Sequence, residues 1–376
     1  MRTAFLVLAH TRLDRTAELV RALIAAGAPV VVHIDQRVAK AQRDRFATVV
    51  DVAAKVISTR KSEWGGYGLV AATLDGVRAL RAMAPGSGHI CLLSGACLPI
   101  RPLAELEAIL AENAGVDFIE SVPVSEQTWV QDGLSLERFT LWHFVSWRRR
   151  KWMFDRLVAL QRGLGVTRRM PEGLEPHLGQ QWWCLSIETI NAILDHDDLP
   201  RWEAFFRWSW IPDEGFFQTL VRHVRRDQEP HHPIHLNRFN SQGRPAVFHD
   251  DHREVLSSSN FFFARKIDPD AEGLYQHFLT SALAAPAGDQ FHASAVGTAP
   301  SQSRRDDPQE HRGQIGAYRL PVGTTPLRAE TARPYVVIIS NGSDLLSALK
   351  EIWAGRNSDY AIHGRLFWAG RPAEWE

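Results

Sequence analysis

The chain has 376 residues, with 43 Lys and Arg against 43 Asp and Glu. This length suits one large domain with a smaller one, and the balanced charge excludes the broad positive field that attracts nucleic acid. Its 13 tryptophans are notable, because indole rings are common at sugar-facing surfaces as well as in cores. The three cysteines form no CxxC pair, so we expect neither a zinc site nor a disulfide framework, and a reducing compartment fits.

The start of the chain carries no visible secretory signal. Thr3–Ala9 already has the pattern of a buried strand, and no apolar run reaches the roughly 20 residues that span a bilayer. We therefore expect a cytoplasmic protein without a transmembrane segment, for which peripheral association with the inner face of a membrane stays open.

In the first half, apolar runs alternate with segments of helical periodicity, which predicts an α/β fold with a mostly parallel sheet flanked by helices. The predicted strands are Thr3–Ala9, Pro29–Ile34, Lys55–Ser58, His89–Leu93 and Asp117–Ile119, and the predicted helices are Leu13–Ala26, Leu69–Met83 and Leu103–Asn113. In such sheets ligands bind at the carboxyl ends of the strands. The residues at those ends are His10, Asp35, Ser94, Gly95 and Glu120.

Two common nucleotide-binding motifs are missing. The turn after the first strand contains no GxGxxG, and the chain has no GxxxxGK[ST] loop. Asp35 suits a hydrogen bond to a base or ribose, but it equally suits a turn before the next helix, and both interpretations stay open.

The segment Trp208–Phe217 places Asp213 and Glu214 directly behind Pro212 and two tryptophans. Proline favours the first turn of a helix and the helix dipole stabilises acids there, so Glu214 is predicted to stay ionised among aromatic rings. Such a carboxylate can take a proton from a sugar hydroxyl. The alternative is a helix cap beside core aromatics, and Asp213 is assigned mainly to that helix start.

Basic residues interleaved with aromatic ones run from Trp147 to Trp152. They could form a nucleic-acid patch, a solvated helix start, or a loop that faces an acceptor or phosphate. The neutral overall charge makes nucleic acid the least favoured partner. Farther on, Gln180–Ser186 is predicted to be a buried strand beside the site, followed by a helix from Ile187 to Leu194.

Two cations in the second half, Arg244 and Lys266, could clamp a diphosphate, although a lone Lys after three phenylalanines is usually a surface residue. The segment His249–His252 is reminiscent of a metal site. Adjacent ligands on one short stretch rarely converge on one ion, so a helix cap is favoured and no metal site is predicted.

The composition changes near residue 284, which predicts three parts. Residues 1–283 form the main domain, residues 284–312 have the composition of a flexible linker, and residues 313–376 are expected to form a small C-terminal α/β module. This module would comprise Tyr335–Ser340, a helix from Leu345 to Trp353, and Tyr360–Trp368, without visible chemistry.

An ordered set of motifs resembles the core-2/I-branching β-1,6-N-acetylglucosaminyltransferase family, which includes the peptide O-xylosyltransferases. The motifs are Phe5–His10, Val32–Asp35, Leu92–Gly95, Leu98–Ile100, Gly179–Trp183, Pro212–Glu214 and Phe263–Asp268. The resemblance covers about residues 1–283. The few cysteines and the lack of a signal anchor are typical of a bacterial member.

The resemblance implies a GT-A-type nucleotide-sugar-binding fold and inverting transfer from a UDP-sugar to a glycan or protein acceptor, with GlcNAc or xylose as the sugar and bacterial surface glycan synthesis as the setting. It implies no metal cofactor, because Arg244 and Lys266 match the cations that replace it. Glu214 matches the catalytic base, and His10 and Asp35 match positions that line the uridine. The sugar and acceptor positions would be Ser94, Gly95, Glu120, Trp182, Trp183, Trp210 and Asp213.

Two other classes of protein remain as alternatives. A non-catalytic sugar-binding module would keep the tryptophans without needing Glu214 or the cation pair. A hydrolase could use Asp213 and Glu214 together, but adjacent residues at a helix start point in different directions, which argues against two carboxylates flanking one bond.

Overall fold

The computed structural model describes residues 2–50, 53–126, 134–238, 245–285, 364–368 and 371–375. Arg244, residues 286–312 of the expected linker and most of the expected C-terminal module lie outside these ranges. Within that module the structure describes two antiparallel strands, β11 (Gly364–Trp368) and β12 (Arg371–Trp375).

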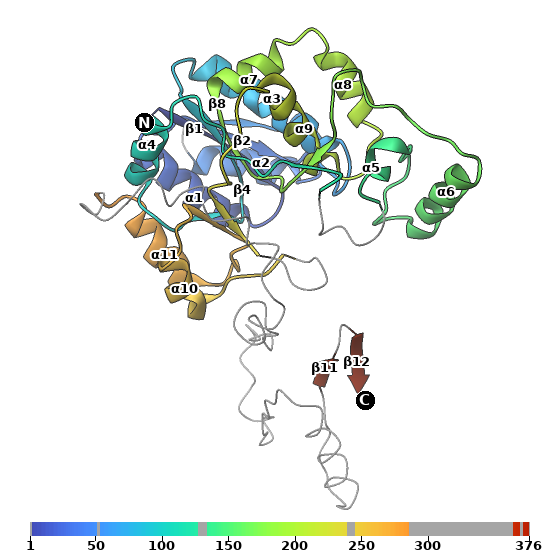
Figure 1. The fold of residues 1–376 in the computed structure, drawn as a ribbon. Coiled ribbons are helices and arrows are strands. Elements are labelled where there is room, and N and C mark those ends of the chain that lie inside the picture. Colours follow the sequence, from blue (N-terminus) through green and yellow to red (C-terminus); the bar gives the residue numbers. More distant parts are fainter. Residues whose placement is uncertain are drawn as a thin grey trace, which may run out of the picture.

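A five-stranded sheet with the order β3-β2-β1-β4-β8 forms the centre of the molecule (Figure 1). Its strands are β1 (Thr3–Ala9), β2 (Val30–Ile34), β3 (Ala54–Ile57), β4 (His89–Ser94) and β8 (Cys184–Ser186). The first four run parallel and β8 runs antiparallel to β4, so the predicted, mostly parallel sheet is confirmed. Strands β1, β2 and β4 are buried on both faces, which is why they are continuous apolar runs in the sequence.

Helices cover both faces of this sheet. One face packs against α3 (Gly68–Met83), α7 (Ile187–Leu194), α8 (Leu199–Phe206) and α9 (Phe216–Val224), and the other against α1 (Leu13–Ala25), α2 (Lys40–Val49) and α4 (Leu103–Glu112). Alternate residues of β1 serve the two cores, with Leu6 and Leu8 on the α3 side and Phe5 and Val7 on the α1 side.

A smaller sheet follows with the order β5-β10-β9. It consists of β5 (Leu98–Pro99), β9 (His235–Asn237) and β10 (Phe263–Arg265), and it packs against α10 (Arg253–Ser257) and α11 (Glu272–Ser281). Strand β10 ends directly before Lys266, so this sheet determines where that lysine lies.

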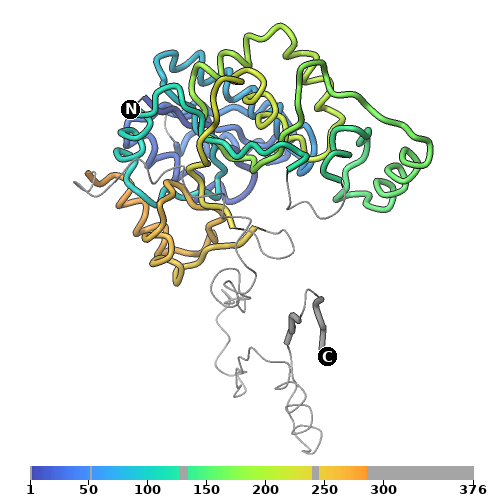
Figure 2. Tube along the Cα trace, in the orientation of Figure 1, coloured from blue at the N-terminus to red at the C-terminus, as the bar shows by residue number. Residues whose placement is uncertain are grey.

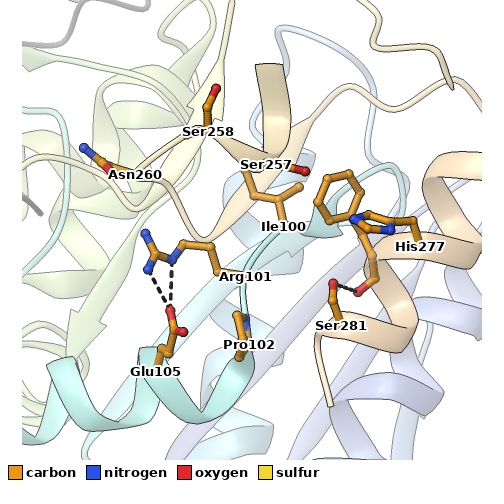
Figure 3. Close-up of a pocket in the computed structure, with 11 residues that line it drawn as sticks. Ile100, Arg101, Pro102, Glu105, Ser257, Ser258, Asn260, His277 and Ser281 are labelled. Carbon is orange, nitrogen blue, oxygen red and sulfur yellow. Dashed lines mark hydrogen bonds and ion pairs between the residues drawn. The ribbon is translucent and has the colours of Figure 1, made fainter. Parts of the chain in front are cut away.

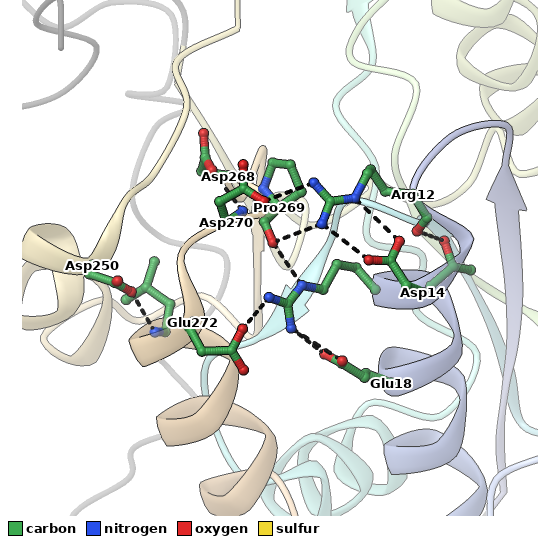
Figure 4. A network of polar contacts seen from close by, with 11 residues as sticks. Arg12, Asp14, Glu18, Asp250, Asp268, Pro269, Asp270 and Glu272 are labelled. Carbon is green, nitrogen blue, oxygen red and sulfur yellow. Dashed lines mark hydrogen bonds and ion pairs between the residues drawn. The ribbon is translucent and has the colours of Figure 1, made fainter. Parts of the chain in front are cut away.

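A cluster of ion pairs joins the beginning of α1 to the chain after Lys266 (Figure 4). Arg12 Nη1 donates to Asp270 at 3.0 Å, and Arg15 Nε donates to the carbonyl of Pro269 at 2.7 Å. Arg15 is also paired with Glu272, the first residue of α11. The cluster therefore fixes the turn that carries His10 against the segment that carries Lys266.

The helices α5 (Glu137–Thr140) and α6 (Lys151–Gly163) lie at the edge of the molecule, away from the N-terminus, as the chain trace shows (Figure 2). Helix α6 buries Phe154, Val158 and Gln161. The Gln161 side chain accepts from the backbone N–H of Trp142 and donates to its carbonyl, at 2.8 and 2.9 Å. We call residues 134–170 the α5–α6 lobe.

Two predicted strands are wrong in extent. In the predicted strand Asp117–Ile119, Phe118 makes single bridges to Cys184 and His231, and Asp117 turns its carboxylate to Ser186 and Thr189. The predicted strand Gln180–Ser186 begins only at Cys184, because side chains bind the peptide groups of Gln180. In both places, buried polar side chains make hydrogen bonds where the backbone of a neighbouring strand would otherwise make them.

Candidate functional site

Asp35 lies at the carboxyl end of β2 and is almost fully buried. Its carboxylate accepts from the backbone and guanidinium of Arg37, at 2.7 to 3.0 Å, and from the backbone of Ser62 at 2.8 Å. Burial alone would raise the pKa of Asp35, but these hydrogen bonds lower it to about 2. Asp35 therefore organises two loops at the edge of the sheet, and any nucleotide contact would be made beside this network.

His10 lies at the neighbouring end of β1, where several charges meet. Burial lowers the pKa of His10, Asp35 raises it, and the cations Lys266, Arg37 and Arg265 lower it further. Backbone hydrogen bonds hold these parts together, because the N–H of Asp35 donates to the carbonyl of Ala9 at 2.9 Å and that of Ile267 to the carbonyl of Ala96 at 3.1 Å. The fold thus brings the predicted His10, Asp35 and Lys266 together.

Arg265 was missed by sequence reasoning and occupies the middle of this region. Its Nε donates to Ser94 Oγ at 3.1 Å, and its guanidinium lies 4.6 Å from the centre of the Trp182 ring. Ser94 Oγ also accepts from the backbone of Ala96 at 3.2 Å. The sequence alone could not reveal this role, because only the pairing of β10 with β5 and β9 brings Arg265 to the end of β4.

Gly95 has a packing role beside Ser94. A Cβ at this position would lie 2.3 Å from Thr16 Oγ1 in α1, so only glycine allows the turn after β4 to approach that helix. Its N–H donates to the carbonyl of Leu8 at 2.9 Å, which continues the pairing of β4 with β1.

The expectation that both tryptophans wall a sugar pocket is wrong for Trp183. Its side chain is fully buried, and its ring centre lies 4.9 Å from that of Phe217 in the core. Because side chains alternate along the segment, Trp182 instead faces Arg265. Trp182 is therefore the member of the pair that contacts a charged group of the site.

Glu214 ends a short 3-10 turn, Pro212–Glu214, that precedes α9 and is separate from it. Ile211 opens this turn with a left-handed backbone, φ 48°, and its N–H donates to the carbonyl of Gly65. The side chain of Glu214 is about a quarter exposed, and its Oε2 accepts from Arg138 Nη1 at 2.9 Å. Arg138 is nearly buried and lies 5.2 Å from the centre of the Trp210 ring.

The ion pair fixes the direction of the Glu214 carboxylate. Arg138 comes from α5, 76 residues earlier in the chain, so sequence spacing could not reveal it. Trp210 supports the guanidinium from behind, and Phe154 of α6 supports Trp210 with a ring separation of 5.4 Å. The α5–α6 lobe thus positions the carboxylate that the sequence predicts to be the base.

Asp213 is not the helix cap that the sequence suggested. Neither the 3-10 turn nor α9 has a side-chain cap, and Asp213 Oδ1 is buried without a hydrogen-bond partner. Burial and the neighbouring charge of Glu214 raise the pKa of Asp213 to about 7, against the lowering effect of Arg138 and Arg265. Near pH 7 the carboxyl of Asp213 is therefore protonated in a large fraction of the molecules.

Asp213→Asn is expected to change how stability depends on pH. The pKa of Asp213 is about 7 in the folded protein and 3.8 in an ordinary side chain, so the folded chain retains a proton that the unfolded chain releases. Wild-type stability should fall as pH rises from about 4 to about 7, and the neutral Asn removes this loss. At pH 8 we expect the variant to melt on the order of 5 °C above wild type. Near pH 4 the two proteins should melt at the same temperature. A melting difference that is the same at both pH values would contradict the buried carboxyl.

Glu120 anchors a buried polar network behind the 3-10 turn. Its Oε2 accepts from the backbone of Gln180 at 2.7 Å, while Oε1 is buried without a hydrogen-bond partner. The Gln180 side chain accepts from Asn237, and its carbonyl accepts from Gln218. Gly179 links this network to the turn, because its N–H donates to the Glu214 carbonyl at 3.0 Å. Glu120 therefore supports the backbone that carries Glu214.

The segment His249–His252 forms a capping arrangement, as favoured by the sequence. His252 Nδ1 accepts from the backbone of His249 at 2.8 Å at the start of a 3-10 turn, Asp250–His252. Within the described ranges, no group of three or more His, Cys, Asp and Glu side chains could hold a metal ion.

A cavity of about 290 Å³ lies away from these residues, between β5, α10 and α11 (Figure 3). Arg101 and Glu105 form an ion pair at its wall, at 2.8 Å, and Ser257, Ser258 and Asn260 face it. None of the predicted site residues lines this cavity, so it is separate from the candidate site.

A family model described as core-2/I-branching enzyme matches residues 3–242, which is more than half of the chain. The match contains His10, Asp35 and Glu214 and ends before Lys266. No curated protein matches the chain. The chain belongs to the core-2/I-branching enzyme family, and with its helix-flanked, mostly parallel sheet it is a glycosyltransferase of GT-A-like fold.

Proposed function

We propose that this chain is an inverting, metal-independent transferase that moves a sugar from a UDP-sugar to an acceptor hydroxyl, with Glu214 as the general base. GlcNAc is the donor sugar that the family name favours, and xylose is the alternative. A glycan of the bacterial surface would be the acceptor. The observation that carries the proposal is the pairing of Glu214 with Arg138, whose guanidinium lies over the ring of Trp210.

The chemistry follows from this arrangement. Glu214 takes the proton of the acceptor hydroxyl while the hydroxyl oxygen attacks the anomeric carbon, and UDP leaves from the other face. The C1–O bond to UDP breaks as the new C1–O bond forms, so the configuration inverts. Negative charge then grows on the diphosphate, and a fixed cation such as Lys266 stabilises it.

The second cation of the expected clamp, Arg244, lies outside the described residues. Arg265 is a further candidate for the diphosphate side, because its electrostatic influence reaches both Asp213 and His10. It already bonds Ser94, so we assign it to shaping the site around Lys266.

A panel of nucleotide sugars tests this function. We expect UDP-sugars, and no GDP- or CMP-sugars, to raise the melting temperature and to release UDP when an acceptor glycan is supplied, with EDTA making no difference. A sugar-binding module would bind glycan without any response to UDP, and a hydrolase would cleave glycan without a nucleotide. Either result would refute the proposal.

No helix among the described residues is both long enough and apolar enough to pass through a bilayer.

A further inference from the structure

The outward face of α6 carries large apolar side chains that nothing in the described chain covers. Trp152 is 60% exposed, Leu160 is 55% exposed, and Leu164, directly after the helix, is 69% exposed. Together with Arg156 these residues are spaced four apart, at positions 152, 156, 160 and 164, so they form one stripe along the helix. The guanidinium of Arg156 lies 5.4 Å from the centre of the Trp152 ring, which confirms that neighbouring positions of the stripe meet.

Packing against the protein does not explain this stripe, because α6 uses its other side for that purpose. Phe154, Val158 and Gln161 are buried, and at 100° per residue they lie on the opposite side from Trp152 and Leu160. A solvated helix would carry charged or polar residues outward. Helix α6 is therefore apolar on two sides, and the outer one is available to a partner.

The charge around the stripe indicates which partner. Between Val145 and Met170 the sequence holds eight Lys and Arg and a single acid, Asp155, although the whole chain is balanced. Lys151 pairs with Asp155, Arg149 with Glu63 and Arg162 with Glu137. The exposed face of the lobe still keeps an excess of positive charge, including Arg148 and Arg150.

We propose that this face of α6 docks on a bilayer that contains anionic phospholipids. Trp152, Leu160 and Leu164 would enter the boundary between headgroups and acyl chains, while the arginines around them bind the phosphates. The lobe lies at the edge of the molecule (Figure 1), and the three apolar side chains are exposed on it.

Two other occupants fit the face less well. A second copy of the chain would bring two positive lobes together, which is repulsive, and the stripe is small for the roughly 1,200–2,000 Å² of a stable interface. Nucleic acid would match the charge, but Leu160 and Leu164 offer nothing to a phosphate backbone. The bilayer satisfies both the apolar stripe and the charge.

Vesicle sedimentation of the full chain tests the surface. We expect binding to vesicles of phosphatidylcholine with phosphatidylglycerol that is at least ~10-fold stronger than to phosphatidylcholine alone, and that weakens in high salt. The triple variant Trp152→Ser/Leu160→Ser/Leu164→Ser should bind at least ~10-fold more weakly. Val49→Ser/Leu283→Ser, which changes exposed apolar residues elsewhere, should bind like wild type.

Three results would overturn the proposal. They are no binding by the wild-type chain, equal binding by the triple variant, or a wild-type dimer in light scattering that the triple variant converts to a monomer. Because the three side chains are exposed, the triple variant should keep the wild-type melting temperature. Arg156→Gln/Arg169→Gln, which keeps the apolar stripe, should lower the salt sensitivity of binding and provides an independent check. None of these measurements depends on the role of Glu214.

Discussion

Glu214→Gln is expected to reduce sugar transfer by at least ~100-fold, and by up to ~10,000-fold, because the amide cannot accept the proton of the acceptor hydroxyl. The Gln carbonyl can still accept the hydrogen bond from Arg138, so the turn and its ion-pair partner should remain in place. The reduction in transfer should therefore appear as a lower kcat, and the affinity for UDP should be nearly unchanged. Initial rates with saturating donor, together with UDP titration by calorimetry, measure both quantities.

The neighbouring carboxyl provides the matched control. Asp213→Asn should lose much less activity, because at pH 6 the raised pKa of Asp213 keeps that carboxyl mostly protonated and Asn resembles this form. Near-normal transfer by Glu214→Gln, or an equal loss in both variants at pH 6, would show that Glu214 is not the base.

Lys266→Ala should weaken donor binding or turnover by about 1–3 kcal/mol, or roughly 5- to 150-fold, the usual effect of removing a charged partner. Lys266 is exposed at the end of the smaller sheet, where its carbonyl accepts from Phe248, so the change should leave the fold intact. Lys266→Arg should restore part of the activity, because it restores the positive charge.

Lys40→Ala removes another exposed lysine, from α2, and should leave the activity unchanged.

Metal removal is the second test of the cation clamp. Transfer by the wild-type chain should persist in EDTA, since the proposed cation is part of the protein. An absolute requirement for Mn²⁺ or Mg²⁺, or full activity in Lys266→Ala, would refute the cation clamp.

The sequence by itself determined the sheet and the edge of it at which the candidate residues lie. Strands β1, β2 and β4 were predicted within a residue or so at each end, because strands buried on both faces are continuous apolar runs. The polar residues that interrupt those runs, such as His10 and Asp35, had to lie at one edge of a parallel sheet. The local sequence drew attention to Glu214 in a Pro-Asp-Glu segment beside tryptophans, but a helix cap explained that segment equally well until the family resemblance was added.

Only the tertiary structure decided how those residues act. Arg138 and Glu214 are 76 residues apart in the sequence, and Arg265 and Ser94 are 171 apart. Helix and strand periodicity predicts no contacts at such sequence separations. Burial likewise depends on what the fold packs around a side chain. It made Trp183 a core residue, gave Asp213 a raised pKa instead of a capping role, and left Trp152 exposed on a helix whose other side was already filled.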